Sequence, residues 1–138
     1  MATKHKEPIL KKPILCLDFD GVIHSYSSGW RGADTIPDPP VDGAIAFMLH
    51  ALRHFDVTIY SSRSAQPGGL DAMKRWLREH AGQTWHETPD GPGLENVRFP
   101  ASKPAAMVSI DDRALTFDGT WPNMQTLMEF KPWNKRTA

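Results

Sequence analysis

Short apolar runs along the chain mark the places where strands are expected. The uninterrupted runs over residues 13–18 and 57–60 predict two buried strands, because a strand that is covered on both faces reads as continuously apolar. Weaker runs over residues 96–99 and 107–110 predict a third and a fourth short strand. A further hairpin is expected around Asp118-Gly119, a dipeptide that is typical of tight turns.

Two segments between these runs repeat their apolar residues at helical spacing. Residues 41–55 have this pattern, and Asp38-Pro39-Pro40 in front of them is a helix start signal. A second helix is expected from the Gly68-Gly69 pair to Gly82, and a short third one over residues 123–128. Strands that alternate with helices predict right-handed βαβ units. The fold class is therefore α/β, a three-layer, Rossmann-like parallel sheet with helices on both faces.

Two segments lack a sustained period and are predicted to be loops. Residues 21–40 contain several glycines and prolines, and we expect a long, structured loop with a small hairpin around Ser28-Gly29. Residues 83–95 are also mostly loop. Long loops in compact domains are often functional, so the first of these is a candidate part of a site.

Length and charge limit the classes of protein to consider. The 138 residues fit one domain, which we place at residues 13–130, between a flexible N-terminal arm at 1–12 and a C-terminal tail at 131–138. Lys plus Arg and Asp plus Glu number 16 each, so no overall field attracts nucleic acid or an anionic membrane. No apolar stretch approaches the roughly 20 residues that span a bilayer. The single Cys16 cannot form an internal disulfide, and we expect a cytoplasmic protein.

Carboxylates follow two of the predicted strands. Asp18 and Asp20 come directly after the first strand, and residues two apart on a strand point the same way. Asp111 and Asp112 follow the strand at 107–110, and in a parallel sheet ligands bind beyond the carboxyl ends of the strands. Several hard oxygen ligands suit Mg²⁺. An Asp-x-Asp-Gly stretch by itself is also a common turn.

Two other side chains belong to the same predicted rim. Ser61 follows the strand at 57–60, and Lys103 lies between the third and fourth strands. Histidine is not needed for this site. His50 and His54, four residues apart on a helix, are read as a solvated helix face and not as zinc ligands.

These residues, in this order, resemble the motifs of the haloacid dehalogenase (HAD) superfamily of phosphotransferases. Residues 18–23, Asp-Phe-Asp-Gly-Val-Ile, resemble its first motif, and Ser61 after its strand resembles the second. Lys103 resembles the third motif and Asp111-Asp112 the fourth. The resemblance covers residues 13 to about 113. It implies an HAD-like core, and the short intervals between the motifs imply that no large cap domain is present.

The resemblance also implies a role for each motif residue. Asp18 would be the nucleophile that forms an aspartyl phosphate, and Asp20 would protonate the leaving alcohol and then deprotonate water. To protonate the leaving alcohol, Asp20 must itself carry a proton. This requires nearby negative charge, since an aspartate is normally ionised at neutral pH. Ser61 would bind the phosphoryl oxygens, with Ser62 as the alternative. Lys103 would neutralise phosphoryl charge.

The metal would be Mg²⁺, held by carboxylates from both acidic motifs. The resemblance gives it Asp18, the backbone carbonyl of Asp20, and Asp111 as ligands. Asp112 would be a further ligand or would orient the others, unless it caps a helix. An aspartate two residues after the nucleophile is what the resemblance associates with phosphatases, whereas dehalogenating members lack it.

Residues that contact substrate are harder to assign from the sequence. His24, Trp30 and Arg31 lie on the loop after the nucleophile, where aromatic and arginine side chains can stack on a base or sugar, although ordinary loop packing explains them as well. Arg63 is a further candidate, or else a surface or salt-bridging arginine. A capless site leaves room for a bulky phosphorylated substrate, small molecule or macromolecule, and nucleic acid is expected only as such a substrate.

Three functions stay open on the sequence. The first is a Mg²⁺-dependent phosphomonoesterase. The second is a phosphotransferase that passes the phosphoryl group to an acceptor other than water. The third is a phosphate-binding or regulatory module with negligible turnover. The physiological substrate and the oligomeric state do not follow from the sequence.

Overall fold

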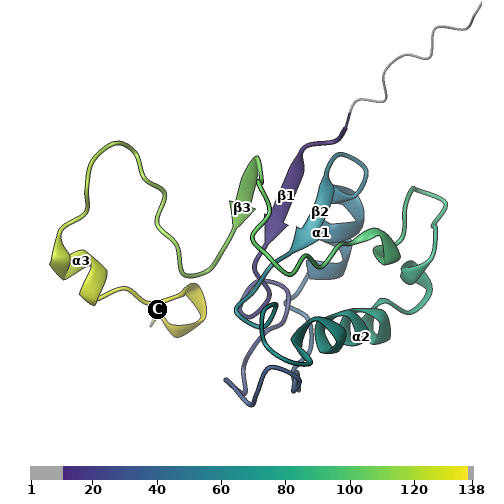
Figure 1. The fold of residues 1–138 in the computed structure, drawn as a ribbon, viewed down its shortest axis with the longest axis horizontal. Helices are drawn as coiled ribbons and strands as arrows, with labels where there is room; N and C mark the ends of the chain where they lie inside the picture. The colour runs from purple at the N-terminus through teal and green to yellow at the C-terminus, as the bar shows by residue number, and fades with distance from the viewer. Residues whose placement is uncertain (1–10, 137–138) are drawn as a thin grey trace, which may run out of the picture.

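The computed structural model describes residues 11–136. Its centre is a parallel sheet of three strands in the order β2-β1-β3, formed by β1 (Ile14–Leu17), β2 (Asp56–Ile59) and β3 (Val108–Ile110) (Figure 1). Leu15 is in register with Val57 on one side and with Val108 on the other. The α/β class and the parallel sheet predicted from the apolar runs are confirmed, in a smaller form than expected.

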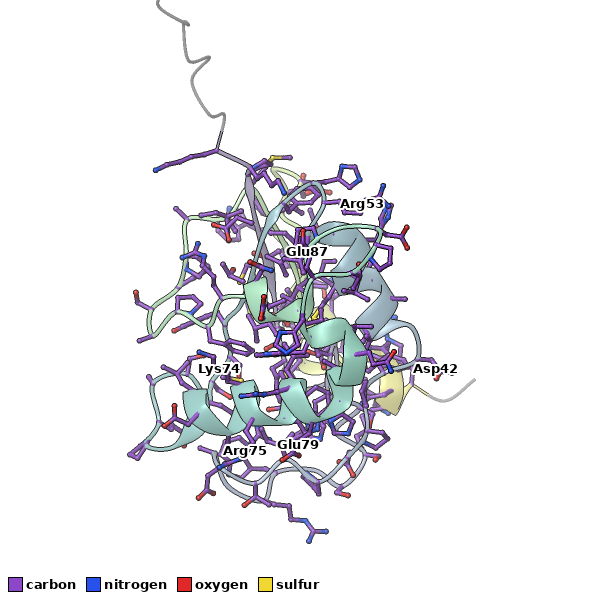
Figure 2. All side chains as sticks on the ribbon, turned by 90° about the vertical axis from the view of Figure 1, so that its right-hand side faces the viewer. Asp42, Arg53, Lys74, Arg75, Glu79 and Glu87 are labelled. Carbon is purple, nitrogen blue, oxygen red and sulfur yellow. The ribbon has the colours of Figure 1, made fainter. Side chains whose placement is uncertain are left out.

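Two helices complete the body of the domain. α1 (Ala44–Ala51) connects β1 to β2, and α2 (Gly69–Ala81) follows β2 (Figure 1). α1 is shorter than the predicted 41–55, because Gly43 precedes it in the left-handed conformation at φ 83° and a left-handed residue cannot belong to the helix. On α2 the charged side chains of Lys74, Arg75 and Glu79 lie on the outer surface (Figure 2).

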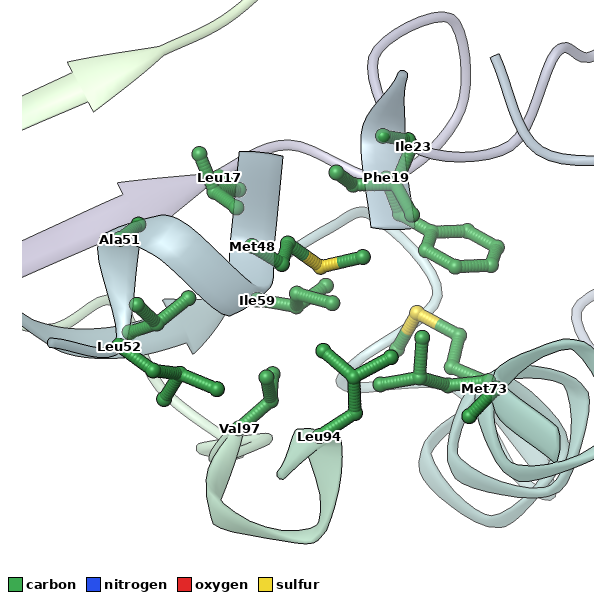
Figure 3. Packing of buried hydrophobic residues seen from close by; sticks show 14 of the residues in the cluster. Leu17, Phe19, Ile23, Met48, Ala51, Leu52, Ile59, Met73, Leu94 and Val97 are labelled. Atoms are coloured by element: carbon green, nitrogen blue, oxygen red, sulfur yellow. The ribbon is translucent and has the colours of Figure 1, made fainter. Parts of the chain in front are cut away.

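The hydrophobic core joins the strands to both helices. Leu17 and Ile59 from the sheet pack with Met48 of α1 and Met73 of α2, and all four side chains are fully buried (Figure 3). Phe19, directly after β1, packs edge to face on Trp76 of α2, with ring centroids 5.1 Å apart. Transfer of these side chains from water is the main term that holds the ends of β1 and β2 in place.

Two predicted elements are reduced or absent. The strand expected at 96–99 is a single bridge in which Arg98 pairs with Thr58, because a 3-10 turn (η2, Leu94–Asn96) precedes it and Pro100, which has no N–H, follows it. The hairpin around Asp118-Gly119 does not form. Instead, the Asp118 carboxylate accepts a hydrogen bond from the Thr120 N–H (2.9 Å), a local turn that leaves the flanking residues unpaired.

The remaining elements are short. A 3-10 turn (η1, Gly82–Trp85) ends α2, and the C-terminal part contains α3 (Met124–Met128) and a final turn (η3, Trp133–Lys135). Between β3 and η3 the chain runs out from the sheet as an arm and returns toward it (Figure 1). None of the helices within residues 11–136 has the length and apolar character needed to cross a membrane.

Candidate functional site

Three aspartates meet at the carboxyl ends of β1 and β3. Asp18 follows β1, Asp111 and Asp112 follow β3, and each offers one oxygen such that the three oxygens all lie within 4.8 Å of one another. The sheet explains this convergence, because β1 and β3 are parallel neighbours and the Asp18 N–H donates to the carbonyl of Ile110 (2.9 Å). The structure thus brings together three of the four predicted carboxylates.

The electrostatics of this triad favour a cation. Burial, then a hydrogen bond shared with the Asp112 carboxylate and the negative charges of Asp111 and Asp112, raises the pKa of Asp18 to about 8. The Asp112 Oδ1 is buried, and within residues 11–136 no backbone N–H, hydroxyl or basic side chain donates a hydrogen bond to it. A hard divalent cation would supply both the missing partner and the missing positive charge. The residues present therefore fit the Mg²⁺ expected from the sequence, while the donor set does not by itself select Mg²⁺ over similar ions.

Gly21 lets the triad assemble. It has φ 83°, and a Cβ at this position would overlap the carboxylate of Asp112. Its carbonyl accepts a hydrogen bond from the Nε1 of Trp133 (2.7 Å), a residue 112 positions later in the chain. The turn after β1 thus lies between the Asp111-Asp112 pair and the C-terminal end of the described chain.

Asp20 belongs to a different cluster. Its Oδ2 accepts from the Nε of Arg63 (2.9 Å), and its Oδ1 accepts from the Nη2 of Arg63 (3.1 Å) and pairs with the Nδ1 of His24 (2.9 Å). Burial alone would raise the pKa of Asp20, but the hydrogen bonds from His24 and Arg63 and the charge of Arg63 outweigh it and lower this pKa. The expectation that nearby negative charge keeps Asp20 protonated is wrong, because its nearest charge is positive.

His24 is fully buried and orients this cluster. Its Nε2 accepts the backbone N–H of Asp38 (3.1 Å), so its Nδ1 carries the proton that it donates to Asp20. The Asp38 carboxylate in turn accepts from the Ser28 hydroxyl (2.6 Å), and its backbone carbonyl accepts from the Nε1 of Trp76 (3.0 Å). His24 is therefore a structural residue, and its predicted contact with substrate is wrong.

Arg63 is also fully buried, and each of its three side-chain nitrogens donates to a group of the protein. Besides Asp20, its Nη1 donates to the carbonyls of Gly32 (2.8 Å), Ala33 (3.0 Å) and Thr35 (3.2 Å). These bonds tie the 21–40 loop to the turn after β2. The alternative reading of Arg63 as a salt-bridging arginine is correct, although the residue is buried and not on the surface.

The other predicted substrate residues remain accessible. Trp30 is about half exposed, and one face of its ring lies over the Arg63 guanidinium at 4.7 Å from the ring centroid. Arg31 is exposed, with its Nε near the carbonyl of Ser28 (3.4 Å). The expected hairpin at Ser28-Gly29 is a turn in which the Gly29 N–H donates to Tyr26, while His24 and Pro40 form an antiparallel bridge at the base of the loop.

The serine and lysine motifs are less clearly placed. Ser61 is buried, and its hydroxyl oxygen accepts the N–H of Arg63 (2.9 Å), whereas Ser62 is exposed. Lys103 is exposed and forms no salt bridge with any carboxylate in residues 11–136. The structure therefore does not join the Lys103 ammonium to the acidic triad.

Two residues of this region were not singled out as site residues on the sequence. Asp38 was read only as part of a helix start signal, and Trp133 lay in the predicted tail. Both act through contacts across ten or more residues of sequence, and no local pattern predicts such contacts.

Compared with protein-family models, with curated proteins and with solved structures, the chain has no significant match.

Proposed function

We propose that this protein is a Mg²⁺-dependent phosphomonoesterase in which Asp18 is the nucleophile. The observation that carries the proposal is the triad of Asp18, Asp111 and Asp112, in which the buried Asp112 Oδ1 has no basic or N–H partner within residues 11–136 and the pKa of Asp18 is raised. The negatively charged oxygens of a phosphate ester are repelled by the three carboxylates, so the ester can bind at this site only together with a cation.

In this proposal the triad would hold the metal, together with the backbone carbonyl of Asp20. A divalent cation bound there would offset the charge of the phosphoryl oxygens and of the nearby carboxylates. Asp18, once ionised, attacks phosphorus and the ester bond to the leaving oxygen breaks. Water then hydrolyses the aspartyl phosphate and regenerates Asp18.

The state of Asp20 changes the expected proton transfers. Because Arg63 and His24 favour its carboxylate form, Asp20 is better suited to accept a proton from the attacking water than to donate one to the leaving group. When no protonated acid donates to the leaving group, its oxygen departs as an anion. We therefore expect aryl phosphates, which release stable phenolates, to react much faster than alkyl phosphates.

Ser61 and Lys103 keep their proposed roles in binding the phosphoryl group. Ser61 is at the end of β2, beside β1, and its hydroxyl still has a proton to donate. For Lys103 the support is its motif position alone. A bulky substrate, including a phosphorylated nucleic acid end, stays a proposal that follows from the expectation of a capless site.

The test is phosphate release from an aryl phosphate by the full chain. Release is expected with Mg²⁺, is expected to stop with EDTA, and should fall at least about a thousandfold in Asp18→Asn. Asp71→Asn, at an exposed aspartate on α2, is the matched control and should keep the wild-type rate. Undiminished release by Asp18→Asn would show that the mechanism is wrong.

A cation-binding or phosphate-binding module without turnover is the second candidate. It is favoured by the ion pair of Asp20 with Arg63, which makes Asp20 a poor proton donor, and by the solvent position of Lys103, whose ammonium is not joined to the triad. Calorimetry separates the two functions. Binding of inorganic phosphate in the presence of Mg²⁺, without release from any aryl, alkyl or nucleotide phosphate, would identify the module.

A further inference from the structure

The segment after the acidic triad exposes an unusual amount of apolar surface. We define residues 113–130 as the C-terminal arm, and within it Trp121 is 83% exposed and Met128 is 84% exposed. Four further apolar side chains are at least two fifths exposed: Leu115, Phe117, Met124 and Leu127. Monomeric proteins rarely expose contiguous apolar patches of more than a few hundred Å².

The arm is held in place at both ends. It begins directly after β3 and the triad, and it ends just before Trp133, which is bound to the carbonyl of Gly21. Its turns and α3 surround an open apolar hollow of about 1030 Å³, and α3 has no buried residue. The arm lies on the β3 side of the sheet (Figure 1), and its exposed side chains are largely apolar.

The neighbouring strand is open as well. Among the residues that the structure describes, β3 pairs with β1 alone and is an edge strand, and all three of its residues are exposed. Parallel strands are normally covered on both faces, and an uncharged open edge is a template for pairing with another chain. A smaller hollow of about 280 Å³, lined by Leu17, Phe47 and Ile110, continues the apolar surface on the body.

We propose that the C-terminal arm and the edge of β3 form an interface with a second copy of this chain. With about 200 Å² for a fully exposed large side chain, the arm and β3 together expose about 1,000 Å² of apolar residues. A stable interface needs about 800 Å² from each partner. The surface is therefore large enough for a dimer.

Two observations favour a second copy over a different protein. The chain has equal numbers of acidic and basic residues, so two copies do not repel each other, and near-zero net charge promotes association. The open edge and the arm also lie next to each other in one chain. A two-fold axis beside β3 pairs the two edges antiparallel and brings each arm against its counterpart, which makes the interface self-complementary and closed. This inference does not rest on the proposed function.

The experiment measures the mass of the full chain by sedimentation equilibrium over a wide range of protein concentration. Twice the mass of one chain is expected. Trp121→Glu and Met128→Glu place a charge in the interface at positions that are exposed within one chain, and each should raise the dissociation constant about thirtyfold or more. Lys74→Gln, on the outer surface of α2 (Figure 2), is the matched control, because it changes the net charge by the same single unit, and it should leave the dissociation constant unchanged.

A mass of one chain at every concentration would overturn the proposal, and so would a mass that grows beyond two copies. Dissociation constants of both arm variants equal to that of Lys74→Gln would overturn it too. Amide exchange of wild-type protein gives an answer that does not depend on any variant. Exchange at residues 107–110 should slow as the protein concentration rises, and exchange that is independent of concentration contradicts the dimer.

Discussion

Replacement of the buried Arg63 by methionine is expected to cost about 5 kcal/mol of unfolding free energy. Arg63 is fully buried, forms two hydrogen bonds with the Asp20 carboxylate and donates to three backbone carbonyls of the 21–40 loop. Removal of one partner of a buried ion pair costs about 3–5 kcal/mol, because the other charge stays buried. Each backbone carbonyl that loses its hydrogen-bond donor adds about 1–3 kcal/mol to this cost, unless a water molecule takes the place of the donor.

This cost is large beside the 5–15 kcal/mol that stabilises a typical domain. At about 3 °C per kcal/mol for a chain of this size, the unfolding midpoint of Arg63→Met should fall by about 15 °C. The loop should also open, so trypsin should cleave after Arg31 faster than in the wild type. Thermal unfolding followed by circular dichroism and a timed digest measure the two effects.

Arg98→Met is the matched control, because Arg98 makes the same two-pronged contact with Asp56 at the surface. Its side chain is 55% exposed, and exposed ion pairs contribute about 0–1 kcal/mol. The midpoint of Arg98→Met should therefore fall by no more than about 3 °C. If Arg63→Met unfolds at the same temperature as Arg98→Met, the buried network does not hold the loop and the reasoning fails.

Three further predictions follow from the triad and the turn beside it. Mg²⁺ at a hundred times its dissociation constant should stabilise the wild type by about 2.7 kcal/mol in thermal shift, and Asp112→Asn should lose most of this gain. In EDTA, the free energy of unfolding measured with urea should fall as the pH rises from about 4 to 8. The raised pKa of Asp18 lets the folded chain keep a proton that the unfolded chain has lost over this interval. A free energy of unfolding that rises over the same interval contradicts the raised pKa. Gly21→Ala should destabilise the fold by at least about 1 kcal/mol and weaken metal binding, as its Cβ displaces the Asp112 carboxylate, and unchanged calorimetric affinity would count against the geometry.

The sequence predicts those parts of the fold that depend on local pattern. Continuous apolar runs mark β1 and β2, and the carboxylates that follow β1 and β3 converge because the carboxyl ends of neighbouring parallel strands lie side by side. The helix pattern of α2 also appears in the structure, with Met73, Trp76 and Leu77 buried on one face.

The partners of Asp20 could not be predicted in this way. Arg63 is 43 residues away from Asp20, and nothing in a local pattern distinguishes a buried arginine from a surface one. The same reason explains why Trp133 and Asp38 were not recognised as part of the site region. The hairpin predicted at Asp118-Gly119 is absent for a different reason. A local turn signal is present there, but a hairpin also requires that the flanking residues pair with each other as strands, and they do not.

The most direct measurement of the central claim is a search for a phosphoryl group on Asp18. Wild-type protein turning over an aryl phosphate with Mg²⁺ is quenched in acid, digested and analysed by mass spectrometry. The account predicts a phosphorylated peptide that contains Asp18, absent when EDTA is added before the substrate and absent in Asp18→Asn. Turnover with no phosphorylated Asp18 peptide under any quench, or with the phosphoryl group on another residue, would contradict it.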